Sequence, residues 1–125
     1  MTAHRILLVD DDPDICAFLA TLLELDGFEP VVASDAEQAL AAAEGISAVL
    51  VDVAMPRVDG LELCRRLRAR GVRAPIAVVS ARPGPDLPQR ALEAGADDFV
   101  RKPFDNADLV ARLRRLIAAK PGGAG

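Results

Sequence analysis

The sequence predicts an α/β fold in which one parallel five-stranded sheet is covered by helices on both faces. Five short apolar runs, rich in Val, Ile, Leu and Ala, alternate from end to end with five segments of helical periodicity. Apolar runs without polar alternation are typical of strands buried on both faces. Regular strand–helix alternation favours right-handed βαβ crossovers. The 125 residues fit one domain, and we find no internal repeat.

The five predicted strands are short, and each ends at a polar or charged residue or just before one. They cover Arg5–Val9, Glu29–Ala33, 48–52, 75–80 and Asp98–Arg101. The last of them leads directly into Lys102 and Pro103. Aliphatic strands of this length suit a buried parallel sheet.

The first helix should begin after Asp12 as N-cap, with Pro13 in its first position. Gly27 should close it as a left-handed residue. The apolar stripe expected to face the core is Ile15, Phe18, Leu19 and Leu22.

The second and third helices also carry start and stop signals. Ser34 and Glu37 form a capping-box pattern that opens an alanine-rich helix ending at Gly45. Asp59 should cap the third helix, which runs to Gly71 with an inward stripe of Leu61, Cys64 and Leu67.

Three prolines between residues 82 and 88 allow the fourth helix to begin only at about Asp86, and Gly95 should end it. Asp105 should cap the last helix, whose core stripe is Leu109, Leu113, Leu116 and Ile117. Residues 120–125 have the composition of a linker or flexible tail.

Composition excludes several functional classes. The net charge is 15 − 19 = −4, and a domain that grips nucleic acid itself usually has a basic face. No apolar run has the length of a membrane span and no signal peptide is apparent, so we expect a cytoplasmic protein without a membrane partner. Cys16 and Cys64 lie on inward helical stripes and are expected to be buried free thiols.

Polar side chains gather where the predicted strands end. Asp10 and Asp11 follow the first strand, Asp52 ends the third, Ser80 ends the fourth, and Lys102 follows the fifth. Because the carboxyl ends of parallel strands meet at one edge of a sheet, we expect these five residues to converge there.

Three carboxylates, one hydroxyl and one ammonium describe a site for a divalent cation and a phosphoryl group. Two carboxylates about 4 Å apart repel by about 1 kcal/mol in water and roughly 4 kcal/mol at an effective dielectric of 20. A hard cation relieves that repulsion, and oxygen ligands favour Mg²⁺ or Mn²⁺ over Zn²⁺. Lysine and serine are common partners of a transferred phosphoryl group.

Each residue alone has an ordinary explanation. Asp12 is better explained as a helix cap than as a ligand, Ser80 alone could be a loop serine, and Lys102 alone a solvated charge. Only their joint pattern, with site residues at the ends of four different strands in the right order, favours a functional site.

Four motifs follow one another in a fixed order. They are Leu-Val-Asp-Asp-Asp-Pro at 8–13, Val-Asp-Val-Ala-Met-Pro at 51–56 with Asp-Gly at 59–60, Ser-Ala at 80–81, and Ala-Gly-Ala-Asp-Asp-Phe-Val-Arg-Lys-Pro-Phe at 94–104. They resemble the receiver domain of two-component response regulators, most of all the OmpR/PhoB (winged-helix) class. The resemblance implies a flavodoxin-like (βα)5 three-layer sandwich with strand order 2-1-3-4-5, formed by a receiver domain over residues 1–119.

The resemblance also implies roles for individual residues. Asp52 would be the phosphoacceptor, taking a phosphoryl group from a cognate sensor histidine kinase. Asp10, Asp11 and Asp52, with the backbone carbonyl of Ala54, would hold Mg²⁺ (or Mn²⁺), Asp10 through water. Lys102 would pair with the phosphoryl oxygens.

Ser80 and Phe99 would be the switch residues that carry the change outward, and the Lys102–Pro103 peptide would be cis. Ala54 and Arg82, each two residues beyond a site residue, carry no acid or amide to orient water. Slow self-dephosphorylation is therefore expected.

The output class is argued from charged residues on the fifth strand and the last helix. They are Asp97, Asp98, Asp108, Arg112 and Arg115. In the OmpR/PhoB class such residues pair between subunits across the face formed by the fourth helix, fifth strand and fifth helix, which implies a homodimer on phosphorylation. The alternative is a solvated helix face. One departure is Pro88, where the class usually has a basic residue.

DNA would be contacted only through an output domain outside these 125 residues, which makes a transcription-regulating role the expectation. The chain could instead be a single-domain regulator or a pseudo-receiver interaction module that works without phosphorylation. A small phosphatase or nucleotide-binding enzyme is disfavoured because neither G-x-G-x-x-G nor G-x-x-x-x-G-K-[ST] occurs.

Overall fold

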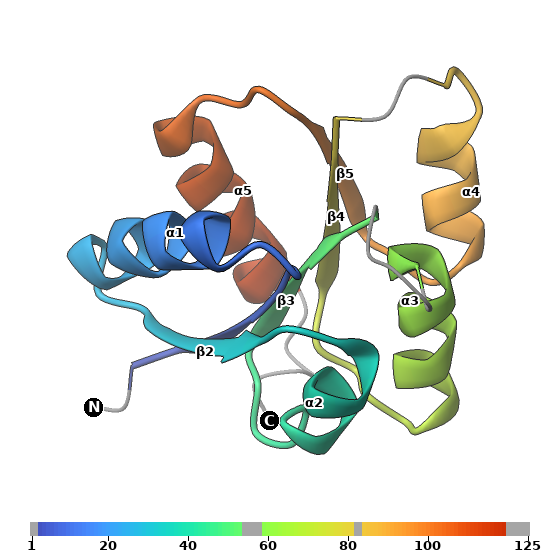
Figure 1. Ribbon diagram of the computed structural model, residues 1–125, viewed down its shortest axis with the longest axis horizontal. Coiled ribbons are helices and arrows are strands. Elements are labelled where there is room, and N and C mark those ends of the chain that lie inside the picture. The colour runs from blue at the N-terminus through green and yellow to red at the C-terminus, as the bar shows by residue number, and fades with distance from the viewer. Residues whose placement is uncertain (1–2, 54–58, 82–83, 120–125) are drawn as a thin grey trace.

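Five parallel strands form one sheet in the order β2-β1-β3-β4-β5, and helices lie on both of its faces (Figure 1). The computed structural model describes residues 3–53, 59–81 and 84–119. The strands are β1 (Arg5–Val9), β2 (Glu29–Ala33), β3 (Ala48–Asp52), β4 (Ile76–Ser80) and β5 (Asp98–Arg101). The helices are α1 (Pro13–Leu25), α2 (Ala36–Ala41), α3 (Gly60–Ala69), α4 (Leu87–Glu93) and α5 (Asn106–Ala119). The predicted fold class and strand order are confirmed.

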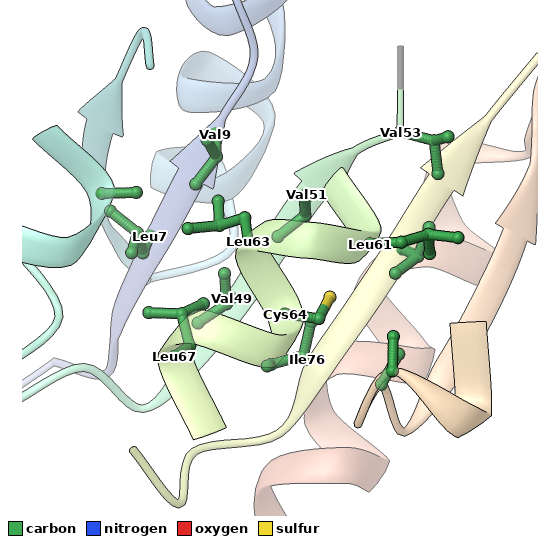
Figure 2. Packing of buried hydrophobic residues seen from close by; sticks show 14 of the residues in the cluster. Leu7, Val9, Val49, Val51, Val53, Leu61, Leu63, Cys64, Leu67 and Ile76 are labelled. Carbon is green, nitrogen blue, oxygen red and sulfur yellow. The ribbon is translucent and has the colours of Figure 1, made fainter. Parts of the chain in front are cut away.

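The sheet separates two aliphatic cores. On one face α2, α3 and α4 pack against side chains such as Leu7, Val49 and Val51 (Figure 2). On the other face α1 and α5 cover the alternate residues, such as Leu8 and Leu50. Successive strand residues point to opposite faces, so strands buried on both sides are apolar at nearly every position.

Most helix boundaries follow the predicted local signals. The carboxylate of Asp12 accepts the amides of Asp14 and Ile15, and the carboxylate of Asp59 accepts that of Glu62. Asp105 likewise accepts the amides of Ala107 and Asp108 at the start of α5. A side-chain acceptor here satisfies amides that have no partner within the helix.

The predicted core stripe of α1 is confirmed for Leu19, and Ile15 and Leu22 pack partly buried against the core, but the stripe is wrong for Phe18. Cys16, Leu19 and Leu23 are the buried residues of the helix, whereas Phe18 is 51% exposed. Cys16 faces the core, and its thiol also donates to the carbonyl of Asp10 at 3.3 Å. Both cysteines are buried and free, as expected.

The capping box of α2 is displaced by one residue from the predicted pair. Asp35 is the N-cap, and its carboxylate accepts the amide of Gln38. The Gln38 side chain in turn accepts the amide of Ser34, the residue before the N-cap, at 2.9 Å. The helix also ends earlier, at Ala41, because the chain then turns inward to bury Ala43 and Ile46 ahead of β3.

Some predictions fall on parts of the chain that are not described. Ala54 and Arg82 lie there, as do residues 120–125 with the expected linker or tail.

Strand β4 begins at Ile76 rather than at Pro75, although the Pro75 carbonyl still accepts the amide of Val49 at 2.9 Å. Within the described ranges, none of the helices combines the length and apolar character needed to span a bilayer.

Candidate functional site

Three carboxylates from two strands meet at the carboxyl edge of the sheet. Asp10 and Asp11 follow β1, and Asp52 is the last residue of β3, the strand that pairs directly with β1. One carboxylate oxygen from each residue lies within 4.8 Å of the other two. Asp10 is buried, Asp52 partly buried and Asp11 exposed, so the cluster opens toward solvent on the Asp11 side.

Burial makes Asp10 hard to ionise. Desolvation by burial and, to a smaller extent, the nearby charge of Asp52 raise the pKa of this carboxyl to about 6. The amide of Asp12 donates to Asp10 Oδ1 at 2.9 Å and, with the charge of Lys102, acts in the opposite direction. Burial and a neighbouring negative charge destabilise the ionised form of this carboxyl, and a bound cation would stabilise it.

Lys102 supplies the positive charge of the site. Its Nζ lies 3.8 Å from Asp52 Oδ2 and 3.9 Å from Asp10 Oδ2. The backbone that carries it is fixed because its amide donates to the carbonyl of Ser80 at 2.8 Å. The Lys102–Pro103 peptide is cis, as expected.

The two expected switch residues lie on neighbouring strands, Ser80 on β4 and Phe99 on β5. Ser80 is fully buried at the end of β4 and stands in register with Arg101 of β5. Phe99 is partly buried against the core on the α3 and α4 side. The guanidinium carbon of Arg101 lies 5.8 Å from the centroid of the Phe99 ring.

The carboxylate cluster fits a magnesium ion. Octahedral Mg²⁺ with ligands at 2.0–2.1 Å holds its oxygens about 3 Å apart for neighbours and about 4 Å for opposite ligands. The three oxygens lie within 4.8 Å of one another, and they would draw closer together for one ion to contact all three. A groove of about 290 Å³ beside Asp10 and Asp11, bordered by Pro13, Val32 and Ser34, gives access from solvent.

The charged residues predicted for an interface make contacts within the chain. Arg112 donates to both oxygens of Asp98 at 3.0 Å and to Asp108 at 2.8 Å. Asp97 instead accepts from Arg68 at 2.8 Å. Arg115 is exposed on α5.

Two residues to which the sequence assigns no role in the site, Arg68 and Gly60, matter for its geometry. Arg68 of α3 reaches the start of β5, but in the sequence it is one of five arginines between 65 and 73. Gly60 packs so close to β3 that an added Cβ would lie 2.5 Å from the carbonyl oxygen of Asp52. Gly60 belongs to the motif at 59–60, and the tertiary contact with β3 gives a reason for a glycine there.

A doubly wound sheet with three acids, a serine and a lysine at its carboxyl edge defines a class of phosphoryl-accepting α/β domains. The sequence model described as "Response regulator receiver domain" matches residues 6–114. The chain belongs to the response regulator receiver domain family, whose members are the phosphorylation-activated switches of two-component systems. Receiver domains bind Mg²⁺ at an acidic pocket and interact with histidine kinases.

Individual relatives agree with this assignment. The chain is 44% identical over 115 residues to "Response regulator MprA" of Mycolicibacterium vanbaalenii, a match that covers 90% of this chain and 50% of that protein. It is 43% identical over 119 residues to "Transcriptional regulatory protein PrrA" of Mycobacterium tuberculosis, covering 94% and 51%. The chain thus spans about half the length of these relatives.

The receiver domain of the Francisella response regulator 1452 superposes with a TM-score of 0.86 at 30% identity. That match covers 93% of this chain and 98% of the Francisella domain. The expected fold and family are both confirmed.

Proposed function

We propose that Asp52 is the phosphoacceptor of this receiver domain and that Asp10, Asp11, Lys102 and Ser80 serve its phosphorylation. The observation that carries the proposal is the position of the Asp52 carboxylate. It lies within 4.8 Å of two other carboxylates and 3.8 Å from the only lysine between residues 1 and 119.

The transfer needs a nucleophile, a charge partner and a hydrogen-bond donor. A carboxylate oxygen of Asp52 attacks phosphorus, a P–O bond forms, and the P–N bond to the donor histidine breaks, leaving an aspartyl phosphate and a free imidazole. Lys102 neutralises charge on the phosphoryl oxygens, and the Ser80 hydroxyl donates to one of them. Positioning and charge neutralisation account for most of the catalysis in phosphoryl transfer.

The acid cluster would hold the metal ion beside this position. Asp10, Asp11 and Asp52 are the side chains for it, with Mg²⁺ (or Mn²⁺) as the ion that an all-oxygen donor set prefers. When bound, the ion would neutralise charge on the carboxylates and on the phosphoryl oxygens. The predicted carbonyl ligand at Ala54 stays a prediction.

We further propose that phosphorylation changes the surface of α4, β5 and α5, with Ser80 and Phe99 as the linked residues. Asp98, Asp108, Arg112 and Arg115 would then exchange contacts within the chain for contacts with a second copy. The relatives named as a response regulator and a transcriptional regulatory protein are about twice as long as this chain. This supports a receiver at 1–119, followed by a linker and a DNA-binding output domain in the whole protein.

A cognate histidine kinase would be the phosphodonor, and its action on this domain would take place in the cytoplasm. Sequence similarity to receiver domains supports this class of donor.

Intact-mass spectrometry after incubation with acetyl phosphate and Mg²⁺ tests the proposal. We expect one phosphoryl adduct that requires the metal and is absent from the Asp52→Asn variant. The Asp59→Asn variant, altered at a nearby helix cap, is the matched control and should still be modified. An unmodified wild type that is folded and binds Mg²⁺ would instead indicate a pseudo-receiver.

A further inference from the structure

Arg68 connects separate segments at the sheet edge opposite the carboxylates. From α3 its guanidinium donates to the carbonyls of Val72 and Ala74 at 2.9 and 2.8 Å, which lie in the connection to β4. It also donates to the carbonyl of Gly95 at 2.9 Å and to Asp97 Oδ2 at 2.8 Å. The planar guanidinium of Arg68 thus donates to four acceptors, and these bonds hold the α3–β4 and α4–β5 connections together.

The contact is tightened on the Asp97 side. Asp97 Oδ2 also accepts the amide of Ile76 at 2.9 Å, and the Asp97 amide donates to the Ile76 carbonyl at 2.7 Å. Both side chains of the Arg68–Asp97 pair are only about a quarter exposed, at 23% and 24%. A charged pair shielded in this way, with backbone partners on both members, constrains geometry more than an exposed ion pair does.

The carboxyl end of α4 is thereby fastened to the sheet. The amides of Ala94, Gly95 and Ala96 bond back to carbonyls within α4, at 3.0 Å for the bonds from Ala94 to Arg90, from Gly95 to Leu92 and from Ala96 to Ala91. Gly95 has a φ of +108° and packs directly on Arg68, since an added Cβ would lie 2.7 Å from Arg68 Cγ. The chain therefore passes from α4 into β5 along one fixed path.

The amino end of α4 is held more weakly. Asp86 occupies the N-cap position with a ψ of −7° and makes no side-chain bond to the amides of this helix. Leu87 donates to the Gly84 carbonyl at 3.3 Å, and Pro88 in the first turn has no amide to donate. A helix of seven residues has few internal hydrogen bonds. How firmly each of its ends is held therefore depends on the contacts that the end makes with the rest of the domain.

We propose that Arg68 and Asp97 form a fixed pivot for the switch, about which the amino end of α4 moves when Asp52 is phosphorylated. Ser80 ends β4 on the side of the molecule where α4 begins, while the Arg68–Asp97 contact holds the far end of α4. Arg68 is thus a positioning residue for the output surface and does not touch the reacting atoms. The proposal rests on the phosphorylation of Asp52 and assigns Asp97 to this contact within the chain.

Hydrogen exchange read by mass spectrometry tests the pivot, first without phosphorylation. We expect the amides of 94–97 to exchange at least about tenfold more slowly than those of 85–90. The reason is that Arg68 holds the segment 94–97 in place through the Gly95 carbonyl and the Asp97 carboxylate. Arg68→Lys keeps the positive charge but loses the planar set of guanidinium donors. This variant should remain folded, and the difference in exchange rate between 94–97 and 85–90 should fall to about threefold or less. Arg65→Lys, on the exposed side of α3, is the matched control and should leave the difference unchanged.

The second stage uses protein whose single adduct has been verified by intact mass. Phosphorylation should alter exchange at 85–90 by about threefold or more and leave 94–97 within about twofold in the wild type. In Arg68→Lys and Asp97→Asn the change should spread to 94–97. Equal changes at both ends in the wild type would overturn the pivot. Absence of an adduct would contradict the phosphoacceptor proposal alone, since the unmodified protein still shows whether Arg68 sets the difference between the two ends.

Discussion

Lys102 Nζ lies 3.8 Å from Asp52 Oδ2, beyond the 2.7–3.2 Å typical of a direct nitrogen–oxygen hydrogen bond. The two groups are therefore close enough to attract each other but are not in direct contact. A lysine at this separation neutralises the carboxylate and can also reach an oxygen added to it. The distance suits a site that must accept a phosphoryl group and then stabilise it.

Replacing Lys102 should slow phosphorylation without abolishing it. Lys102→Gln keeps the length of the side chain but removes the charge nearest to Asp52. Loss of one charge-stabilising group lowers the rate by about 10²-fold. The rate of adduct formation with acetyl phosphate and Mg²⁺ measures this, with Arg101→Gln as the control. That neighbouring cation is exposed and contacts Phe99, so equal losses in both variants would contradict the assigned role.

The raised pKa of Asp10 predicts how stability depends on pH without metal. Folding raises the pKa of this carboxyl from 3.8 to about 6, so the folded state binds its proton more tightly than the unfolded state. The corresponding stability is fully present below pH 3.8 and is lost as pH rises through 6, a decline on the order of 3 kcal/mol.

Urea denaturation in EDTA between pH 4.5 and 7.5 measures this contribution as the difference between wild type and Asp10→Asn. The variant should become the more stable of the two as pH rises. Parallel curves for the two proteins would show that Asp10 does not carry the effect.

Magnesium should stabilise the domain, and more at pH 7.5 than at pH 5. Mg²⁺ displaces the proton of Asp10, so its affinity should fall by up to about tenfold for each pH unit below 6. A ligand at 100 times its Kd adds about 2.7 kcal/mol of stability, which thermal denaturation with and without MgCl₂ detects. Asp11→Asn should remove most of the shift. Asp14→Asn, an exposed acid in the first turn of α1, should not.

Gly60→Ala should disturb both the fold and the site. Its Cβ would lie 2.5 Å from the Asp52 carbonyl oxygen and 2.9 Å from Val53 Cα, and backbone atoms cannot move aside as a flexible side chain can. We expect a loss of about 1–3 kcal/mol in unfolding free energy, with slower phosphorylation because Asp52 is displaced.

Gly71→Ala is the control for that variant, because its Cβ would meet nothing within 4 Å but its φ is +85°. Chemical denaturation should show a loss of about 1 kcal/mol from backbone strain alone. Its rate of phosphorylation should equal that of the wild type. A normal phosphorylation rate in Gly60→Ala would contradict a positioning role for that glycine.

Arg112→Gln should impair dimerisation far more than folding. Arg112 is paired with Asp98 and Asp108 and is 33% exposed, so its loss should change the unfolding free energy by no more than about 1 kcal/mol. Sedimentation velocity of the phosphorylated protein should show a dimer for the wild type and a monomer for the variant. Arg114→Gln, on the same helix but paired with Asp26, should still dimerise. A dimeric Arg112→Gln protein would exclude this residue from the interface.

Local chemistry made much of the fold predictable. Asp12, Asp59 and Asp105 were identified as caps because an acidic side chain at a helix start satisfies amides a few residues away. The convergence of Asp10, Asp11 and Asp52 followed from topology, since all parallel strands end at one edge. These relationships depend on sequence neighbours and on the order of elements, and both can be read from the chain.

Phe18 and Arg68 show where that reasoning ends. Phe18 is expected in the core from its helical spacing, but the rotation of α1 on the sheet leaves it half exposed and buries Leu23. Arg68 looks like its neighbouring arginines until folding brings Gly95 and Asp97 to it. The sequence by itself determined the elements, their order and the acidic edge of the sheet. Tertiary structure alone decided how α1 is rotated on the sheet and which arginine pairs with Asp97, because both depend on contacts between segments distant in the chain.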